Sequence, residues 1–203
     1  MPSSADGSRA WLGLAALLGA GACLASAFEP ASIDWRPALA WREPWRAWTA
    51  AFVHLSPLHL GANLGGLGLV AAFGFLARLP LTGVAAWALA WPLTQFGLLV
   101  RPDLLRYGGL SGVLHAGVAV AALFLIVQGR GPRRLVGVAT VAVLSAKVLA
   151  EAPWGEVLRH PAGWGIAVAP AAHASGLLAG LVTAAAVVLM RLGAPRSRPA
   201  AAP

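Results

Sequence analysis

Long apolar stretches alternate with short polar segments along almost the whole chain. Each stretch is close to the roughly 20 residues that a helix needs to cross the hydrocarbon core of a bilayer. The stretches cover residues 11–28, 56–77, 81–100, 111–127, 135–152 and 171–190. The pattern therefore predicts an all-α integral membrane protein: a six-helix domain over residues 11–190, with tails at 1–10 and 191–203.

The predicted spans begin and end at residues that favour helix boundaries. Ser56 and Pro57 provide a cap and a proline at the first helical position of the second span. The polar segment 29–55 between the first two spans is different, because it holds four tryptophans. Tryptophan is enriched at the membrane–water interface, so we expect this segment to lie on the bilayer, with a short amphipathic helix over 42–53.

Composition supports membrane insertion. The chain has 203 residues, of which 59% are hydrophobic and 11% charged, whereas a soluble domain is typically about one quarter charged. The net charge of +8 does not indicate nucleic-acid binding, because the arginines flank the apolar stretches. With one cysteine, Cys23, a disulfide framework or a cysteine metal site is excluded.

Six spans place both termini on one side of the membrane. Eight arginines lie in the terminal segments and the loops of that side, against six on the other side. The positive-inside rule then predicts cytoplasmic termini. The alternative for residues 1–27 is a cleaved signal peptide that ends at Ala25-Ser26-Ala27, but an uncleaved first helix gives the more consistent topology.

Polar side chains gather at one predicted depth. The second, fourth and sixth spans all run inward, so their first turns meet near the outer face. These turns carry His59 and Asn63, then Ser111 and His115, then His173. Polar groups are costly within a membrane and indicate function, so we expect a site there.

Ser111 is the candidate nucleophile of that site. Serine at a helix start is commonly a cap, which is the structural alternative. A cap needs no flanking glycines, however, and here Gly109 and Gly112 flank the serine. Glycines allow a sharp bend and a close approach of another helix, both of which an activated serine needs.

His173 is the candidate general base, because an imidazole can take the proton of a serine hydroxyl. Gly176 and Gly180 follow it at four-residue spacing, a pattern that lets two membrane helices pack closely. The alternative is a histidine that bonds a loop carbonyl. His115 is a rival base, but it lies on the same helix as Ser111 and is expected to pack against His173 instead.

His59 and Asn63 lie four residues apart and share a helix face. Together with the backbone N–H of Ser111, their donors could stabilise an oxyanion. The alternative for Asn63 is a hydrogen bond that joins helices. Lys147 and Glu151 are also four apart, and we interpret them as a structural ion pair near the outer end of the fifth span.

These motifs resemble the rhomboid intramembrane serine proteases. The resembling segments are Gly109-Leu110-Ser111-Gly112, Ala172-His173 with Gly176 and Gly180, His59 with Asn63, and Glu43-Pro44-Trp45-Arg46 in the first loop. The resemblance covers the six-span chain in order. It implies a Ser111–His173 dyad without a third acid, and an oxyanion site from Asn63, His59 and the Ser111 backbone. Many rhomboids carry a tyrosine where this chain has His115.

The finer resemblance is to the bacterial rhombosortase branch, which is associated with removal of C-terminal sorting tails that begin with Gly-Gly. It implies a protease of the bacterial cytoplasmic membrane that acts on membrane-anchored protein substrates, without a cofactor or metal. Two other functions stay open: a haem-binding cytochrome with axial ligands from His59, His115 and His173, and an inactive rhomboid-like protein that binds helices.

Overall fold

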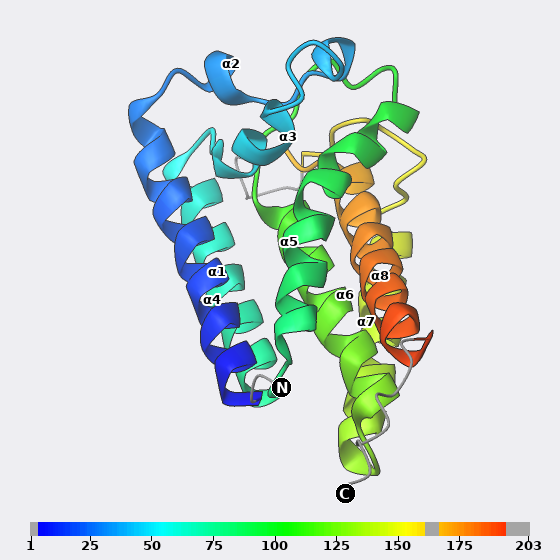
Figure 1. The fold of residues 1–203 in the computed structure, drawn as a ribbon. Helices are drawn as coiled ribbons and strands as arrows, with labels where there is room; N and C mark the ends of the chain where they lie inside the picture. The colour runs from blue at the N-terminus through cyan, green and yellow to red at the C-terminus, as the bar shows by residue number, and fades with distance from the viewer. Residues whose placement is uncertain (1–3, 161–166, 194–203) are drawn as a thin grey trace, which may run out of the picture.

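A computed structural model describes residues 4–160 and 167–193 of the chain, and these residues form a helical bundle (Figure 1). The long helices are α1 (Ser4–Leu24), α4 (Pro57–Leu76), α5 (Leu81–Phe96), α6 (Ser111–Gln128), α7 (Pro132–Ala150) and α8 (Pro170–Gly193). Two short helices, α2 (Pro30–Ile33) and α3 (Arg46–Thr49), lie across one end of the bundle. The predicted all-α class is confirmed.

Within the described residues, five helical segments are long and apolar enough to cross a membrane: α1, α4, α5 with the turn that follows it, α6 and α8. The fifth predicted span forms a helix, α7, but it is not among them. Two arginines near its start and Lys147 near its end reduce its hydrophobicity.

The first helix starts at Ser4, earlier than the predicted start near residue 11, so the described part of the segment expected as a tail is helical. Asp6 lies in the first turn, where a negative charge interacts favourably with the helix dipole and stabilises the helix. Trp11 is fully buried, and its indole N–H donates to the carbonyl of Val70 at 3.0 Å. Residues 4–10, which precede the apolar stretch, thus belong to the same helix. The other predicted tail also begins late, because α8 continues to Gly193, and residues 194–203 lie outside the described part.

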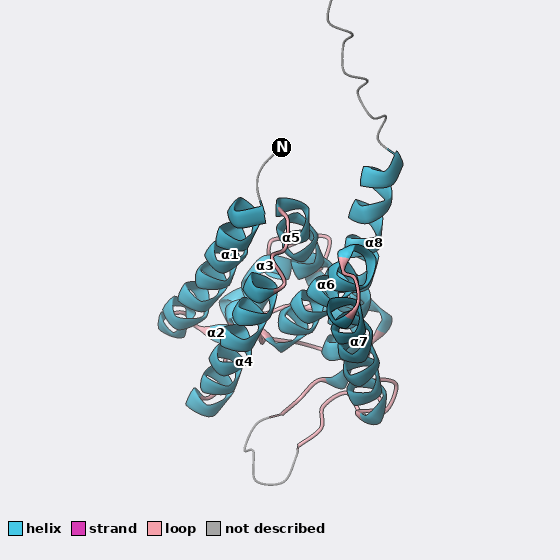
Figure 2. Cartoon of the chain, turned by 90° about the horizontal axis from the view of Figure 1, so that it is seen from below, coloured by secondary structure: helices cyan, strands magenta, loops and turns pink. Residues whose placement is uncertain are grey.

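Helix α6 is the central helix of the bundle, with α4, α5, α7 and α8 packed around it (Figure 2). Its contact with α8 is backbone to backbone. A side-chain carbon added to Gly176 would collide with the carbonyl of Gly112, and one added to Gly180 would collide with the carbonyl of Ala116. The predicted close packing through small residues is confirmed, and it brings Ser111 and His173 onto facing helices.

Segment 29–55 departs from the expected interfacial helix. Instead of one helix over 42–53, the chain forms α3 between short turns, and Trp35 is fully buried in a second apolar cluster. Trp41, Trp45 and Trp48 remain exposed, as expected for residues that meet the bilayer.

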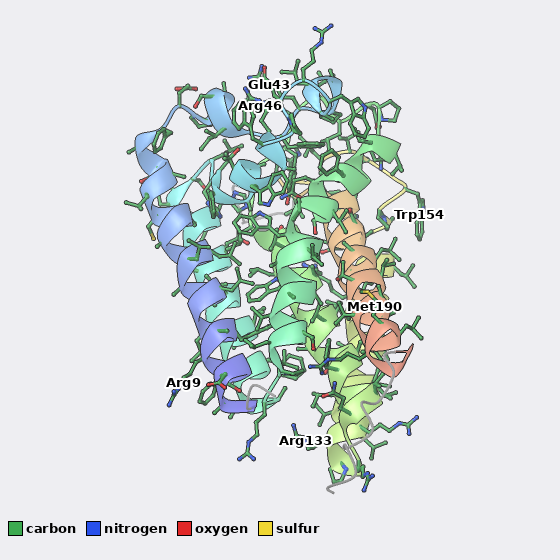
Figure 3. The ribbon with its side chains drawn as sticks, viewed as in Figure 1. Arg9, Glu43, Arg46, Arg133, Trp154 and Met190 are labelled. Carbon is green, nitrogen blue, oxygen red and sulfur yellow. The ribbon has the colours of Figure 1, made fainter. Side chains whose placement is uncertain are left out.

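A buried carboxylate explains why this segment folds back on itself. Asp34 is 1% exposed and pairs with Arg36 at 3.0 Å, Arg46 at 3.3 Å and Arg106 at 2.7 Å. Arg46 also pairs with Glu43, and both lie at this end of the bundle in Figure 3. A buried charge needs such partners, so the cluster ties segment 29–55 to the loop that precedes α6.

The first turns of α4, α6 and α8 lie toward the end of the bundle that α2 and α3 cover (Figure 1). The first turn of α1 and the last turn of α8 lie at the opposite end, near Arg9 and Arg133 (Figure 3). The prediction that three polar helix starts share one level is confirmed.

Candidate active site

A short loop delivers Ser111 to the site, and the backbone of two segments holds that loop. Trp35 and Tyr107 exchange two N–H···O hydrogen bonds of 2.8 Å, and the Gly109 N–H donates to the carbonyl of Ala50 at 2.9 Å. Gly109 has a φ of 144°, a conformation that side chains rarely allow. The buried hydroxyl of Tyr107, which the sequence did not single out, donates to the Gly109 carbonyl at 3.2 Å.

Ser111 is the first residue of α6 and does not cap it, because Leu110 occupies the cap position. The Ser111 Oγ lies 3.0 Å from Nε2 of His173, which sits in the first turn of α8 and is 6% exposed. The capping alternative is therefore wrong, and the predicted contact between the serine and His173 is confirmed. A hydroxyl and an imidazole nitrogen at this distance are placed for proton transfer.

His115 packs against His173, as predicted. The two rings stack with centroids 4.2 Å apart and an interplanar angle of 12°. Nδ1 of His115 lies 2.7 Å from the backbone carbonyl oxygen of Ser111, so this ring addresses the backbone and not the nucleophile. His115 thus takes a supporting position beside His173.

Lys147 and Glu151 form the predicted ion pair, with 2.9 Å between Nζ and Oε1. The sequence interpreted this pair as structural, but the structure places both residues in contact with the histidines of the site. Glu151 Oε2 is 2.7 Å from Nδ1 of His173, and Lys147 Nζ is 2.7 Å from Nε2 of His115 and 3.1 Å from Nδ1 of His173. An acid therefore contacts the imidazole, in contrast to the dyad that the resemblance implied.

The direction of α7 could have signalled this contact. It runs opposite to α4, α6 and α8, so its last turn reaches the level at which those helices begin. Four-residue spacing shows that Lys147 and Glu151 share a face, but not which neighbour that face meets.

One cavity of about 1520 Å³ adjoins the serine and is lined by residues from α4, α6, α7 and α8. Its polar lining includes His59, Asn63, Ser111 and His173. Charged residues such as Arg106, Lys147 and Glu151 also line it, and α4 and α7 contribute apolar residues that include Leu69, Phe73 and Leu144. A cavity that combines polar groups beside the serine with apolar residues from α4 and α7 fits a peptide that continues into a hydrophobic segment.

The predicted oxyanion donors share this cavity with the serine. Asn63 is 5% exposed and lines the cavity, and the His59 ring packs close to Gly109 in the serine loop. His54, which the sequence gave no reason to select, packs edge-on against His59 with centroids 4.9 Å apart. Burial lowers the pKa of His54 below its usual range, which favours the neutral ring in the loop before α4.

If the chain cleaves peptides, as the motif resemblance implies, Asn63→Ala should lower kcat by about 10²-fold with a smaller change in KM, because an oxyanion donor acts where charge develops in the transition state. Steady-state kinetics on a membrane-anchored peptide would measure both constants. If kcat is unchanged and thermal stability falls, Asn63 joins helices instead. Ala62→Gly, a change at a neighbouring exposed cavity position, is the control for effects on α4 itself.

The geometry does not favour the haem alternative. His115 and His173 stack at 4.2 Å, which leaves no space for a porphyrin between them, and both nitrogens of His173 already face Ser111 and Glu151. Within residues 4–160 and 167–193, no three histidine, cysteine or acidic side chains are grouped as metal ligands.

Comparison of the chain with protein families, curated proteins and solved structures gave no significant match. The case for a function therefore depends on the residues and geometry of the site and on the motif resemblance.

Proposed function

We propose that this chain is a rhomboid-type intramembrane serine protease with Ser111 as nucleophile and His173 as general base. The observation that carries the proposal is the 3.0 Å contact between Ser111 Oγ and His173 Nε2, made across the α6–α8 interface beside an open cavity. A structural serine at a helix start usually bonds the backbone of its own helix. Contact with a histidine from another helix is instead typical of an activated serine.

The proposed reaction is hydrolysis of a peptide bond. His173 takes the proton of Ser111 as Oγ attacks the carbonyl carbon, and Asn63, His59 and the Ser111 N–H stabilise the oxyanion. The imidazolium then protonates the leaving amine, and water releases the acyl group from Ser111 by the reverse sequence of proton transfers.

The proposed substrates are proteins anchored by an apolar segment. The apolar part of the cavity supports this, because it continues from the serine along α4 and α7 at residues such as Leu69 and Leu144. In the finer proposal, drawn from the rhombosortase resemblance, the enzyme removes C-terminal tails that begin with Gly-Gly. Two adjacent glycines have no side chains to hinder the backbone and allow many conformations, so a serine at a helix start can reach their peptide bond.

The proposed setting is a bacterial cytoplasmic membrane, with α7 as the fifth of six spans, the termini in the cytoplasm and the site near the outer face. The arginine distribution supports this orientation. Helix α7 can cross despite its charges, because Lys147 pairs with Glu151 and Arg133 donates to the carbonyl of Ala77 at 2.7 Å near the opposite end.

Labelling of the purified protein with a fluorophosphonate, followed by peptide mapping, tests the activity. The expected result is one adduct, on Ser111, because such probes react with serines that a neighbouring base activates. Failure to label any serine, or an adduct on another serine, would remove the proposed function. Soret absorbance in the purified protein would instead revive the haem alternative.

A further inference from the structure

We propose that Glu151 is the third member of the Ser111–His173 site, a positioning residue that fixes the tautomer of His173, and that Lys147 orients its carboxylate. This inference builds on the proposed protease function. It departs from the two-residue site that the motifs imply, because it gives the imidazole an acidic partner from a third element of the fold.

The carboxylate of Glu151 is placed with one oxygen on each partner. Oε2 lies 2.7 Å from Nδ1 of His173, and Oε1 lies 2.9 Å from Nζ of Lys147. Glu151 directly follows α7, whereas Ser111 begins α6 and His173 lies in the first turn of α8. Two packing interfaces, α6–α8 and α7–α8, must therefore be correct for the three residues to meet.

The neighbouring ring settles how Lys147 donates. The backbone carbonyl oxygen of Ser111 only accepts hydrogen bonds, so His115 Nδ1, at 2.7 Å from it, must carry a proton. In a neutral ring, Nε2 of His115 is then an acceptor, and Lys147 Nζ donates to it at 2.7 Å. A second N–H of Lys147 goes to Glu151.

The remaining question is which group faces Nδ1 of His173. Lys147 Nζ lies 3.1 Å from this nitrogen and Glu151 Oε2 lies 2.7 Å from it. If Lys147 donated to Nδ1, Nε2 would carry the proton and could not accept the one on Ser111. An ionised carboxylate only accepts hydrogen bonds, so an unprotonated Nδ1 would place two acceptors 2.7 Å apart. Nδ1 therefore carries the proton and donates to Glu151. Nε2 is then free to accept from Ser111.

This arrangement also places charge where the reaction needs it. When the Ser111 proton moves to Nε2, His173 becomes an imidazolium with Glu151 at hydrogen-bond distance, and the carboxylate stays ionised throughout. The charged or titratable groups that face His173 are His59 from α4, His115 from α6, and Lys147 and Glu151 from the end of α7. Among them, Glu151 is the group whose charge opposes that of the imidazolium.

The test uses the full-length protein in detergent, with labelling rate and the nitrogen NMR spectrum of the histidine rings as readouts. In the native protein, at a pH where the ring is neutral, we expect His173 to carry its proton on Nδ1. Its signals are assigned by their loss in His173→Gln. A proton on Nε2 in the native protein would overturn the proposal, and this measurement needs no variant at Glu151.

Glu151→Gln keeps the shape of the side chain but allows its amide to donate to Nδ1, which selects the wrong tautomer. We expect fluorophosphonate labelling of Ser111 to slow by about 10³-fold or more, by analogy with the corresponding change in serine triads. We also expect the His173 proton to move to Nε2. Glu151→Asp, which retains a carboxylate, should recover a measurable part of the rate.

Lys147→Met is the matched control, because it removes the other half of the ion pair and leaves the carboxylate. The His173 proton should stay on Nδ1. A purely structural pair would make the Lys147 and Glu151 variants equally harmful, with no change of tautomer in either, and that result would overturn the proposal. If native protein labels Ser111 and Glu151→Gln labels at the same rate, this inference fails and the protease function stands. If native protein does not label, the protease function itself fails.

Discussion

We expect Ser111→Ala to abolish fluorophosphonate labelling and to lower peptide cleavage by about 10³-fold or more, because the proposed acyl intermediate forms on the Ser111 hydroxyl. The fold should survive. Loss of the hydrogen bond between the hydroxyl and His173 costs about 1 kcal/mol. Cleavage of a membrane-anchored peptide in liposomes and the thermal unfolding midpoint measure the two effects.

Ser145→Ala provides the matched control, since Ser145 is a half-buried serine of α7 that does not line the cavity. This variant should label and cleave as the native protein does. Normal cleavage by Ser111→Ala would show that the catalytic group lies elsewhere, whatever the geometry of the α6–α8 interface.

His173→Ala should be as inactive as Ser111→Ala, whereas His115→Ala should keep activity within about 10- to 100-fold of the native protein. His173 Nε2 faces Ser111 Oγ, so removal of this proposed base should leave the hydroxyl unactivated. His115 supports the stacked ring and Lys147, so its removal misplaces the base without deleting it.

Labelling rates of the two variants, measured under identical conditions and corrected for the folded fraction, distinguish the two roles. Should His115→Ala be the inactive protein and His173→Ala the active one, the assignment of the base would be reversed. Equal, severe losses with equally severe unfolding would mean that the stack holds α6 and α8 together, so thermal unfolding must accompany both measurements.

Local patterns in the sequence determined the helical segments and the level of their polar residues. Each apolar stretch predicts its own helix because burial of backbone polar groups in a membrane requires local hydrogen bonding. The glycines at Gly112, Gly176 and Gly180 predicted a close helix pair, since small side chains are what such contacts need. Ser111 and His173 could therefore be placed together from spacing and direction.

The environment of segment 29–55 was decided by tertiary structure. Nothing local distinguishes Trp35, which is buried, from Trp41, which is 81% exposed. Asp34 forms ion pairs with Arg46 and Arg106 from other parts of the chain. These pairs hold Asp34 in the interior, so the adjacent Trp35 is buried as well. Ion pairs between distant residues leave no periodic signal in a sequence.

The partners of His173 show the same division. The sequence placed His173 opposite Ser111 and paired Lys147 with Glu151, but it could not connect the two pairs. That connection depends on how α7 is rotated about its own axis and how far its last turn extends beside α8. Rotation and depth are set by side-chain packing along whole helices, a cooperative property of the bundle. The sequence by itself thus determined which polar groups lie at the level of Ser111, and only the tertiary structure decided that Glu151 faces the imidazole of His173.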